Sequence, residues 1–379
     1  MIKSLYIDNF KALNQFEIDF QPLTLLIGAN SVGKSTVLQA LELLAYFTKG
    51  KEYGELNNYL IEKGWSAKDL KSTLSKKRHI TFKLKIEIKK VEYTWTVIFN
   101  VKHRLLEVVK EEIRDETGFI FLFKDNDLIE FNSKDPQVLP QLGFNFSMTT
   151  SSLMFIDTLN IELQTIKKVL NGLAMFDFSS TSNLKSANQL KIRNEIGRNG
   201  ENLAAYLYKL SKEDLKKLTE ALQTYAPFFE QVRITKKRKG EVEINIKETF
   251  SNSYIDAAHL SDGMMRLLAI LTLALTESGN QTILIEEIED GINPNLAGEV
   301  IKTLLQVTEN TQQQFILTTH NPLILDWVPV ENIHFLYRTS EGQVQQKKFI
   351  NSPIVMQNLD YMNPGEIWIN FTKEELIAE

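Results

Sequence analysis

The hydrophobic and polar positions of the first forty residues alternate as they do in β-strands. Apolar residues recur at alternate positions in residues 2–10 and 15–20, and residues 23–27 form a continuous apolar run. Alternation predicts strands with one buried face, and a continuous run predicts a strand buried on both faces. A glycine-bounded loop and an amphipathic pattern follow, so this region predicts a strand, a loop and a helix in that order.

Between residues 80 and 131 the pattern predicts an antiparallel sheet. Segments rich in β-branched and aromatic residues are separated there by turn-forming residues, as at 115–118 and 124–127. The spacing then becomes helical, and we expect helices within residues 155–176, 201–211 and 212–232. A hairpin with a basic tip is expected over residues 232–247, and helices alternate with strands in the last third.

These changes of pattern predict three parts. Residues 1–150 hold the phosphate-binding loop and the antiparallel β subdomain, residues 151–230 form a helical lobe, and residues 231–379 return to alternating α and β elements. The expected fold class is α/β, with a mixed central sheet. No internal repeat and no sustained heptad pattern occur, so no long coiled coil is expected.

Composition narrows the chemistry. The 379 residues are 43% hydrophobic and 24% charged, as in ordinary globular proteins, and no apolar run or leader pattern predicts a membrane segment or export. We therefore expect a cytoplasmic protein without a membrane partner. The chain has no cysteine, which excludes disulfides and thiolate-bound zinc. The net charge of −5 means that DNA binding would depend on local basic patches.

Residues 28–36 match the phosphate-binding pattern G-x-x-x-x-G-K-[ST] between an expected strand and an expected helix. The glycines let backbone N–H groups turn toward phosphates, Lys34 bridges phosphate oxygens, and Ser35 offers its hydroxyl to Mg²⁺. The sequence therefore predicts a site for ATP and Mg²⁺. The expected nucleotide-binding residues of this loop are Asn30, Ser31, Gly33, Lys34, Ser35 and Thr36.

A second feature is the apolar run 283–285, which ends in Glu286 and Glu287. Side chains alternate across a strand, so adjacent carboxylates at its end point in different directions. Glu286 is the candidate metal ligand, and Glu287 is the candidate catalytic residue that polarises water. Most of the chain separates these carboxylates from Lys34, which predicts a large insertion within the ATPase fold.

Two further segments are ambiguous when taken alone. In residues 260–266, Ser261 and Gly263 suit an ordinary helix start, but a helix N-terminus also favours a phosphate. His320 follows the apolar run 315–317, where a histidine is usually structural. Their order and spacing resemble the signature motif and the switch histidine of ABC-type ATPases.

Taken together, the motifs resemble the RecF, SMC and OLD-like branch of ABC ATPases, and within it the bacterial predicted ATPases often placed in anti-phage systems. The resemblance also covers residues 7–11, 200–205 and 286–294. It implies an ATPase head whose two copies enclose ATP. The catalytic residues would be Lys34, Glu287 and His320 of one copy, facing Ser261 and Gly263 of the other.

The resemblance adds Lys11 to the nucleotide-binding residues, and it also marks departures. Glu286 stands where aspartate is usual, Ile288 where proline is usual, and Asn293 where aspartate or histidine is common. A Q-loop glutamine has only Gln137 and Gln141 as candidates.

Three functions remain open from the sequence. The first is a homodimer or higher oligomer that hydrolyses ATP and gates a separate effector such as a nuclease, in anti-phage defence. The second is a standalone RecF-like clamp that binds DNA through basic residues 76–79 or 236–239. The third is a non-catalytic scaffold that responds to nucleotide. The tail residues Trp368 and Phe371 are expected to pack on the head itself.

Overall fold

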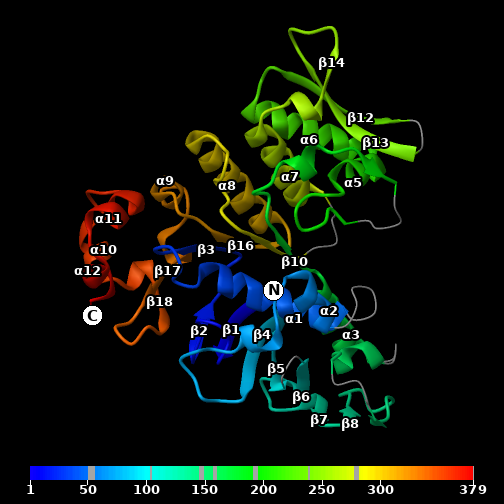
Figure 1. Cartoon of the computed structure of the whole chain (residues 1–379), viewed down its shortest axis with the longest axis vertical. Helices are drawn as coiled ribbons and strands as arrows, with labels where there is room; N and C mark the ends of the chain where they lie inside the picture. Colours follow the sequence, from blue (N-terminus) through cyan, green and yellow to red (C-terminus); the bar gives the residue numbers. More distant parts are fainter. Residues whose placement is uncertain are drawn as a thin grey trace.

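The computed structural model describes residues 1–49, 56–102, 105–144, 149–156, 160–190, 195–237, 240–276 and 281–378. Within these residues the chain forms an eight-stranded, a six-stranded and a four-stranded sheet, with helices packed between and around them (Figure 1). No described helix is both long and apolar enough to cross a membrane.

The six-stranded sheet is the centre of the molecule. Its strand order is β10 (Leu173–Phe176), β15 (Thr282–Ile285), β16 (Gln314–Thr318), β3 (Leu23–Ile27), β17 (Ile333–Arg338) and β18 (Val344–Lys348). All neighbours are parallel except β17 and β18. Every residue of β3, β15 and β16 is buried, as their continuous apolar sequences predict for a sheet covered on both faces.

Two hydrophobic cores lie on the two faces of this sheet. Because side chains alternate along β3, Leu25 belongs to one core and Leu26 to the other. The core of Leu26 includes α1 (Lys34–Lys49) and α3 (Ile161–Asn171), and the core of Leu25 includes α8 (Pro294–Asn310). At the edge formed by the carboxyl ends of β3, β15 and β16 lie the phosphate-binding loop, the carboxylates after β15 and His320.

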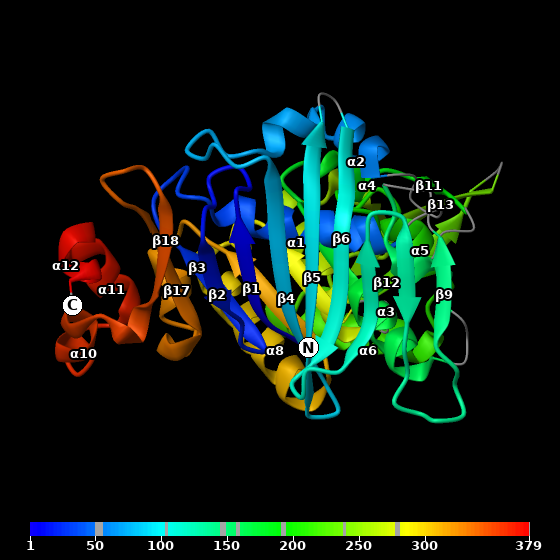
Figure 2. The same ribbon diagram turned by 90° about the horizontal axis from the view of Figure 1, so that it is seen from below.

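The eight-stranded antiparallel sheet covers α1 from below in Figure 1 and is seen face-on in Figure 2. Alternate residues of β5 are buried, since one face of the sheet packs on the core. This confirms the antiparallel sheet expected within residues 80–131. Its strand order is β2 (Phe16–Asp19), β1 (Ile2–Asp8), β4 (His79–Ile88), β5 (Val91–Lys102), β6 (Leu105–Asp115), β7 (Ile120–Asp125), β8 (Leu128–Phe131) and β9 (Gln141–Phe144).

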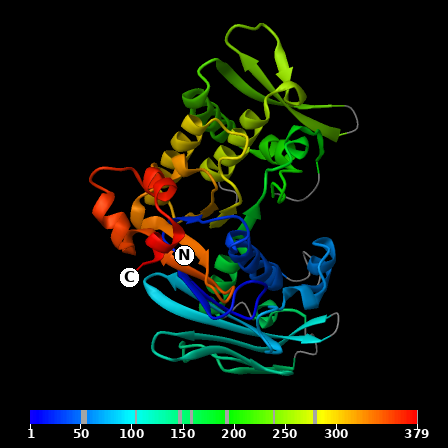
Figure 3. The ribbon, with the colours of Figure 1, turned by 60° about the vertical axis from the view of Figure 1, so that its left-hand side comes forward.

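The third sheet lies in a lobe at the opposite end of the molecule (Figures 1 and 3). The expected hairpin is present as β12 and β13, and Ser211 caps α6 by accepting a hydrogen bond from the N–H of Asp214. The lobe contains β11 (Asn188–Gln189), β12 (Phe229–Lys236), β13 (Glu241–Glu248), β14 (Tyr254–Asp256), α4 (Ser182–Lys185), α5 (Leu203–Lys209), α6 (Lys212–Tyr225) and α7 (Asp262–Leu275).

The expected helix over residues 155–176 is wrong at its C-terminal end. The helix α3 stops at Asn171, and Leu173–Phe176 form β10, which pairs in parallel with β15. A short apolar segment suits a buried helix or a buried strand equally well, and pairing with β15 decides between them. The boundaries at residues 150 and 230 stay a prediction, but β10 joins part of the expected lobe to the central sheet.

The remaining helices are short. They are α2 (Leu56–Glu62), α9 (Pro322–Leu325), α10 (Pro353–Asn358), α11 (Pro364–Asn370) and α12 (Lys373–Ile377), with 3₁₀ turns at Ala67–Leu70, Ser152–Phe155, Ala257–His259, Val330–Asn332 and Phe349–Asn351. The longest described helix, α8, has 17 residues, so the described chain contains no long coiled coil.

Candidate functional site

The phosphate-binding loop lies between β3 and α1, at the carboxyl edge of the central sheet. Gly28 has φ +139°, and a Cβ atom there would lie 2.2 Å from the backbone carbonyl oxygen of Leu336 on β17. Gly33 has φ +103°, and Ser31 also adopts a left-handed conformation with φ 62°. The loop therefore needs glycine at both ends, because it combines positive φ angles with close packing against the neighbouring strand.

Lys34 is the first residue of α1, and its side chain folds back into the loop. Its Nζ donates to the carbonyl oxygens of Gly28 at 2.8 Å and Ala29 at 3.1 Å, and it lies 3.5 Å from Nδ1 of His320. Burial lowers the pKa of Lys34 to about 8, although nearby carboxylates, Glu287 foremost, act to raise it. The loop thus holds a buried ammonium group beside the histidine that the sequence singled out.

The carboxylates after β15 come from the strand beyond β16, which lies next to β3. Glu287 is exposed and has φ 49°, its N–H donates to Oγ1 of Thr318, and its Oε1 lies 3.3 Å from Nε2 of His320. Glu286 is half-buried, and its carboxylate acts on the pKa of Lys34. A non-glycine residue with positive φ is uncommon, so the backbone turn aims Glu287 differently from Glu286.

Glu289 is a functional candidate to which the sequence assigned no role. Its Oε1 accepts hydrogen bonds from the backbone N–H groups of His320 at 2.8 Å and Asn321 at 3.0 Å. It therefore fixes the loop that carries His320. The available signal was its place in the motif of residues 286–294, three residues after Glu286.

A pocket of about 670 Å³ gathers most of the expected site residues. It brings together the loop, Glu287 from the end of β15 and His320 from the end of β16. Arg338, at the end of β17, also lines it, although no sequence motif marked this residue. The lining residues are Ala12, Asn30, Ser31, Gly33, Lys34, Ser35, Thr36, Glu287, His320 and Arg338.

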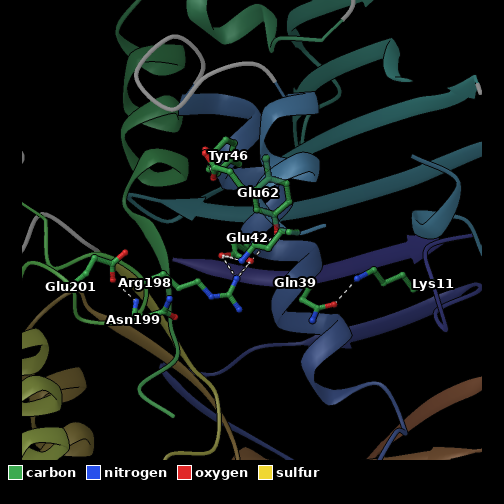
Figure 4. A network of polar contacts seen from close by, with 10 residues as sticks. Lys11, Gln39, Glu42, Tyr46, Glu62, Arg198, Asn199 and Glu201 are labelled. Atoms are coloured by element: carbon green, nitrogen blue, oxygen red, sulfur yellow. Dashed lines mark hydrogen bonds and ion pairs between the residues drawn. The ribbon is translucent and has the colours of Figure 1, made fainter. Parts of the chain in front are cut away.

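Lys11 does not line this pocket. Its Nζ donates to Oε1 of Gln39 on α1 at 2.8 Å and lies 3.2 Å from the centre of the Trp65 ring. Figure 4 shows Lys11 and Gln39 pointing toward one another. Burial lowers the pKa of Lys11 to about 8. Lys11 therefore contacts the side of α1, and direct nucleotide contact by Lys11 stays a prediction.

Ser261 and Gly263 lie at the start of α7 and do not line the pocket either. Ser261 is exposed and caps the helix by accepting a hydrogen bond from the N–H of Met264. Figures 1 and 3 place α7 in the upper lobe, away from α1. The two motifs expected to enclose one nucleotide are thus separated within a single chain.

The N-terminus of α7 is nevertheless fixed to the loop after β15. A Cβ atom on Gly263 would lie 2.3 Å from the carbonyl oxygen of Gly291. The buried Arg266 donates to the backbone carbonyl and the carboxylate of Asp290, the latter at 2.6 Å. The start of α7 and the acidic loop after β15 are therefore in direct contact within one chain.

The Q-loop candidates lie on or beside the eight-stranded sheet, and a Q-loop role for either glutamine stays a prediction. Gln141 begins β9 at the edge of the eight-stranded sheet, and Gln137 precedes that strand, so neither lies at the carboxyl edge of the central sheet. The segment that does reach this edge follows β10 and begins at Asp177.

The basic segments are partly neutralised. Lys77 pairs with Asp8 at 2.5 Å, and Lys237 pairs with Glu243. Residues 238 and 239 of the expected basic tip lie outside the described residues.

The tail packs on the head, as expected. Trp368 and Phe371 line a cavity of about 230 Å³ together with Ala29 and Val32 of the phosphate-binding loop.

Known proteins resemble this chain in sequence. A family model described as "AAA domain, putative AbiEii toxin, Type IV TA system" matches residues 23–326. The Septu protein PtuA of Bacillus mycoides (strain KBAB4) is 22% identical over 344 residues, which cover 86% of this chain and 38% of that protein. The chain thus spans well under half the length of this relative.

Solved structures resemble it in fold. The SmcHead bound to the C-winged helix domain of ScpA matches with a TM-score of 0.57 and 14% identity, over 91% of this chain and 96% of that chain. A second match is the Smc head domain with an extended coiled coil, bound to the C-terminal domain of ScpA derived from Pyrococcus furiosus. Its TM-score is 0.56 and its identity 12%, and the match covers 95% of this chain and 99% of that chain. The expected α/β head fold is therefore confirmed.

Proposed function

This chain belongs to the AAA-domain family whose model matches residues 23–326, and from that premise we propose that it hydrolyses ATP as a head-to-head dimer that gates a separate effector. One observation carries the proposal. The pocket at the carboxyl edge of the central sheet gathers Lys34, Glu287 and His320, whereas Ser261 and Gly263 lie outside it on α7. One chain then supplies half of each of two nucleotide sites.

Within its own half, each residue has a chemical task that suits its position. Lys34 would neutralise phosphate oxygens, and the backbone N–H groups of residues 30–36 would donate to them. Glu287 would orient and polarise the attacking water. His320, whose ring lies between Lys34 and Glu287, would donate to the oxygens of the transferred phosphate.

The donor set also fits Mg²⁺. Ser35 lines the pocket, and Glu286 leaves β15 next to Glu287. A hydroxyl and one carboxylate, completed by phosphate oxygens and water, is a ligand set that Mg²⁺ accepts. Bound there, the ion would supply positive charge that stabilises the transferring phosphate.

The second half of each site would come from another copy. The exposed Ser261 hydroxyl and the N-terminus of α7 offer donors that suit a phosphate. These donors can reach a P-loop nucleotide only when two heads face each other. Binding would then favour the closed dimer, and hydrolysis would remove the group that holds it closed.

The output is proposed to belong to a separate effector, such as a nuclease, in anti-phage defence. The similarity to Septu protein PtuA supports this setting, and the match covers 38% of that protein. The described residues form the ATPase head and its lobe. We therefore propose that the dimer contacts its effector only in the closed, nucleotide-bound state.

The test uses the full chain with ATP and Mg²⁺. We expect the wild type to release phosphate from ATP. The rate of release by Glu287→Gln should be at least about a hundredfold lower, because no carboxylate then activates the attacking water. Glu287→Gln should also accumulate as an ATP-dependent dimer in size-exclusion chromatography with light scattering. Lys34→Ala should neither hydrolyse ATP nor dimerise.

Glu309→Gln, which changes an exposed carboxylate at the end of α8, is the matched control and should behave as the wild type. If the molar mass of Glu287→Gln in solution is the same with and without ATP, the proposed ATP-dependent dimer is disproved. Wild-type turnover no higher than that of Lys34→Ala would favour a non-catalytic scaffold instead.

A further inference from the structure

Arg338 is a charged residue of the P-loop pocket that no sequence motif predicted. It ends β17, which runs parallel to β3 and on the side of β3 opposite to β16. This topology places the end of β17 beside the phosphate-binding loop, since both strands finish at the same edge of the sheet. Arg338 therefore reaches the pocket from the side opposite to Glu287 and His320.

Two backbone carbonyl groups orient its guanidinium. Nε of Arg338 donates to the carbonyl oxygen of Ser31 at 3.0 Å, and Nη1 donates to that of Gly342 at 3.3 Å. Gly342 has φ +80° in the turn between β17 and β18. The backbone of Arg338 is itself held, because its carbonyl accepts from Nζ of Lys373 at 3.4 Å. The side chain is thus exposed but aimed by fixed partners.

The charge of this guanidinium is not balanced locally. In the described part of the chain, no ion pair involves Arg338, and Nη2 makes no hydrogen bond. An arginine held by carbonyl groups, with one nitrogen left over and no carboxylate partner, is suited to an anionic ligand.

The contact with Ser31 limits what the ligand can be. Ser31 lies within the same loop whose N–H groups turn toward phosphates, and its left-handed φ shapes that turn. A guanidinium fixed on this residue lies against the phosphate-binding loop of its own chain. Its planar fork of donors matches phosphate oxygens and is always charged.

We propose that Arg338 contacts a phosphate of the nucleotide bound by the P-loop of the same chain, as a substrate-binding residue distinct from Lys34. This inference rests on the proposed function, because it assumes that ATP occupies the pocket. Arg338 approaches from β17, Lys34 from α1, and the two cations would hold the phosphates from different sides. The competing explanation is that Arg338 only clamps the loop through the carbonyl of Ser31.

Three substitutions separate charge from clamping. Arg338→Gln retains an N–H donor for the Ser31 carbonyl but carries no charge. Arg338→Lys retains the charge but loses the two-pronged geometry, and Arg338→Ala removes both. Arg233→Ala, which removes an exposed arginine of β12 in the lobe, is the control.

The experiment measures ATP affinity of the full chain with Mg²⁺ by calorimetric titration at two salt concentrations. We expect Arg338→Ala and Arg338→Gln to weaken ATP binding about tenfold or more, as for loss of a charge-assisted hydrogen bond. Arg338→Lys should recover part of the loss, and Arg233→Ala should bind as the wild type. Salt should weaken binding less in Arg338→Gln than in the wild type, since one charge pair is missing.

Other outcomes overturn the inference. Wild-type affinity in Arg338→Gln combined with a loss in Arg338→Ala would assign Arg338 to clamping alone. Unchanged affinity in every variant, with loss only of ATP-dependent dimerisation, would place the contact on the second copy. If the wild type itself binds no ATP while Lys34→Ala behaves identically, the proposed function fails, and that result is distinct from a failure of Arg338.

Discussion

Burial and nearby charge act on Lys34 in opposite directions. Burial lowers its pKa most strongly, the carboxylates of Glu287, Glu289 and Glu286 raise it, and the result is a pKa of about 8. The lysine is therefore near its titration point at physiological pH. A bound phosphate would be a further anionic partner and would raise this pKa again, so ATP binding and protonation of Lys34 should favour each other.

The affinity for ATP is expected to fall as the pH rises through 8. Above that pH the free protein loses the Lys34 proton, and binding must restore it, which costs about tenfold in affinity per pH unit at most. Titrations with ATP between about pH 7 and pH 9 at constant ionic strength measure this slope. Lys34→Arg is the control, because arginine stays charged over this range and should give a flat profile.

Lys11 has a similar pKa but lies outside the pocket. If the ATP affinity of the wild type changes with pH as little as that of Lys34→Arg, Lys34 is not the group that titrates. If the affinity of Lys34→Arg still falls with rising pH, another group such as Lys11 titrates instead.

At the scale of elements, α1 joins the phosphate-binding loop to the segment that leads into the lobe (Figure 4). Glu42, in the middle of α1, accepts hydrogen bonds from Tyr59 at 2.8 Å, Lys63 at 3.2 Å and Nη1 of Arg198 at 2.7 Å. The carbonyl of Arg198 accepts from the N–H of Asp177, directly after β10. Arg198 thus connects α1, the end of β10 and the segment of chain that enters α5.

Breaking the Glu42–Arg198 pair should destabilise the fold. The side chains are 13% and 24% exposed, so each lost partner leaves a largely buried charge. We expect Glu42→Gln and Arg198→Gln each to lower the free energy of unfolding by about 1–3 kcal/mol. The double variant should lose less than the sum of the two, since the second change removes the charge that the first one left unpaired.

Urea denaturation of the four proteins measures this cycle. Lys216→Gln, which breaks an exposed pair on α6, is the control and should leave stability essentially unchanged. Strictly additive effects of the two changes would show that Glu42 and Arg198 do not act as a pair.

At the scale of the whole molecule, the nucleotide pocket and the start of α7 lie in different parts of one chain (Figure 1). Yet the contacts of Gly263 with Gly291 and of Arg266 with Asp290 fix α7 to the loop after Glu287. In a closed dimer, movement of the signature segment of one copy would therefore reach the acidic loop of that same copy. The two proposed sites would be coupled through this contact.

The half-site arrangement predicts complementation between two inactive variants. Lys34→Ala lacks a working P-loop, and Ser261→Arg lacks a working signature segment, so each alone should be inactive. In an equal mixture, a mixed dimer combines both variants and contains one complete site out of two, so phosphate release should recover to at most about half of the wild-type rate. Phosphate release from the mixture measures this.

A mixture of Lys34→Ala with Glu287→Gln is the control, because both changes disable the same half and no complete site can form. Absence of recovery in the first mixture, with both proteins folded, would mean that each chain holds its complete site.

Features encoded by neighbouring residues could be predicted from the sequence, and features that depend on contacts between distant segments could not. The P-loop and the carboxylates after β15 were predicted because each is encoded by a short segment whose strand and turn signals are local, whereas His320 was singled out by the resemblance to ABC-type ATPases. Strands buried on both faces have continuous apolar sequences, so β3, β15 and β16 were identified. The sequence by itself therefore determined the phosphate-binding loop and most of the strands of the central sheet.

Only the tertiary structure decided the features that depend on pairing between distant segments. β10 is a strand because it pairs with β15, Glu289 matters because it binds the backbone of His320, and Arg338 enters the pocket because β17 runs beside β3. Lys11 was assigned to the nucleotide, but it contacts Gln39 and Trp65. Apart from Glu289, which lies within the motif of residues 286–294, these contacts leave no periodic or local signal, since they join residues that become neighbours only when the central sheet assembles.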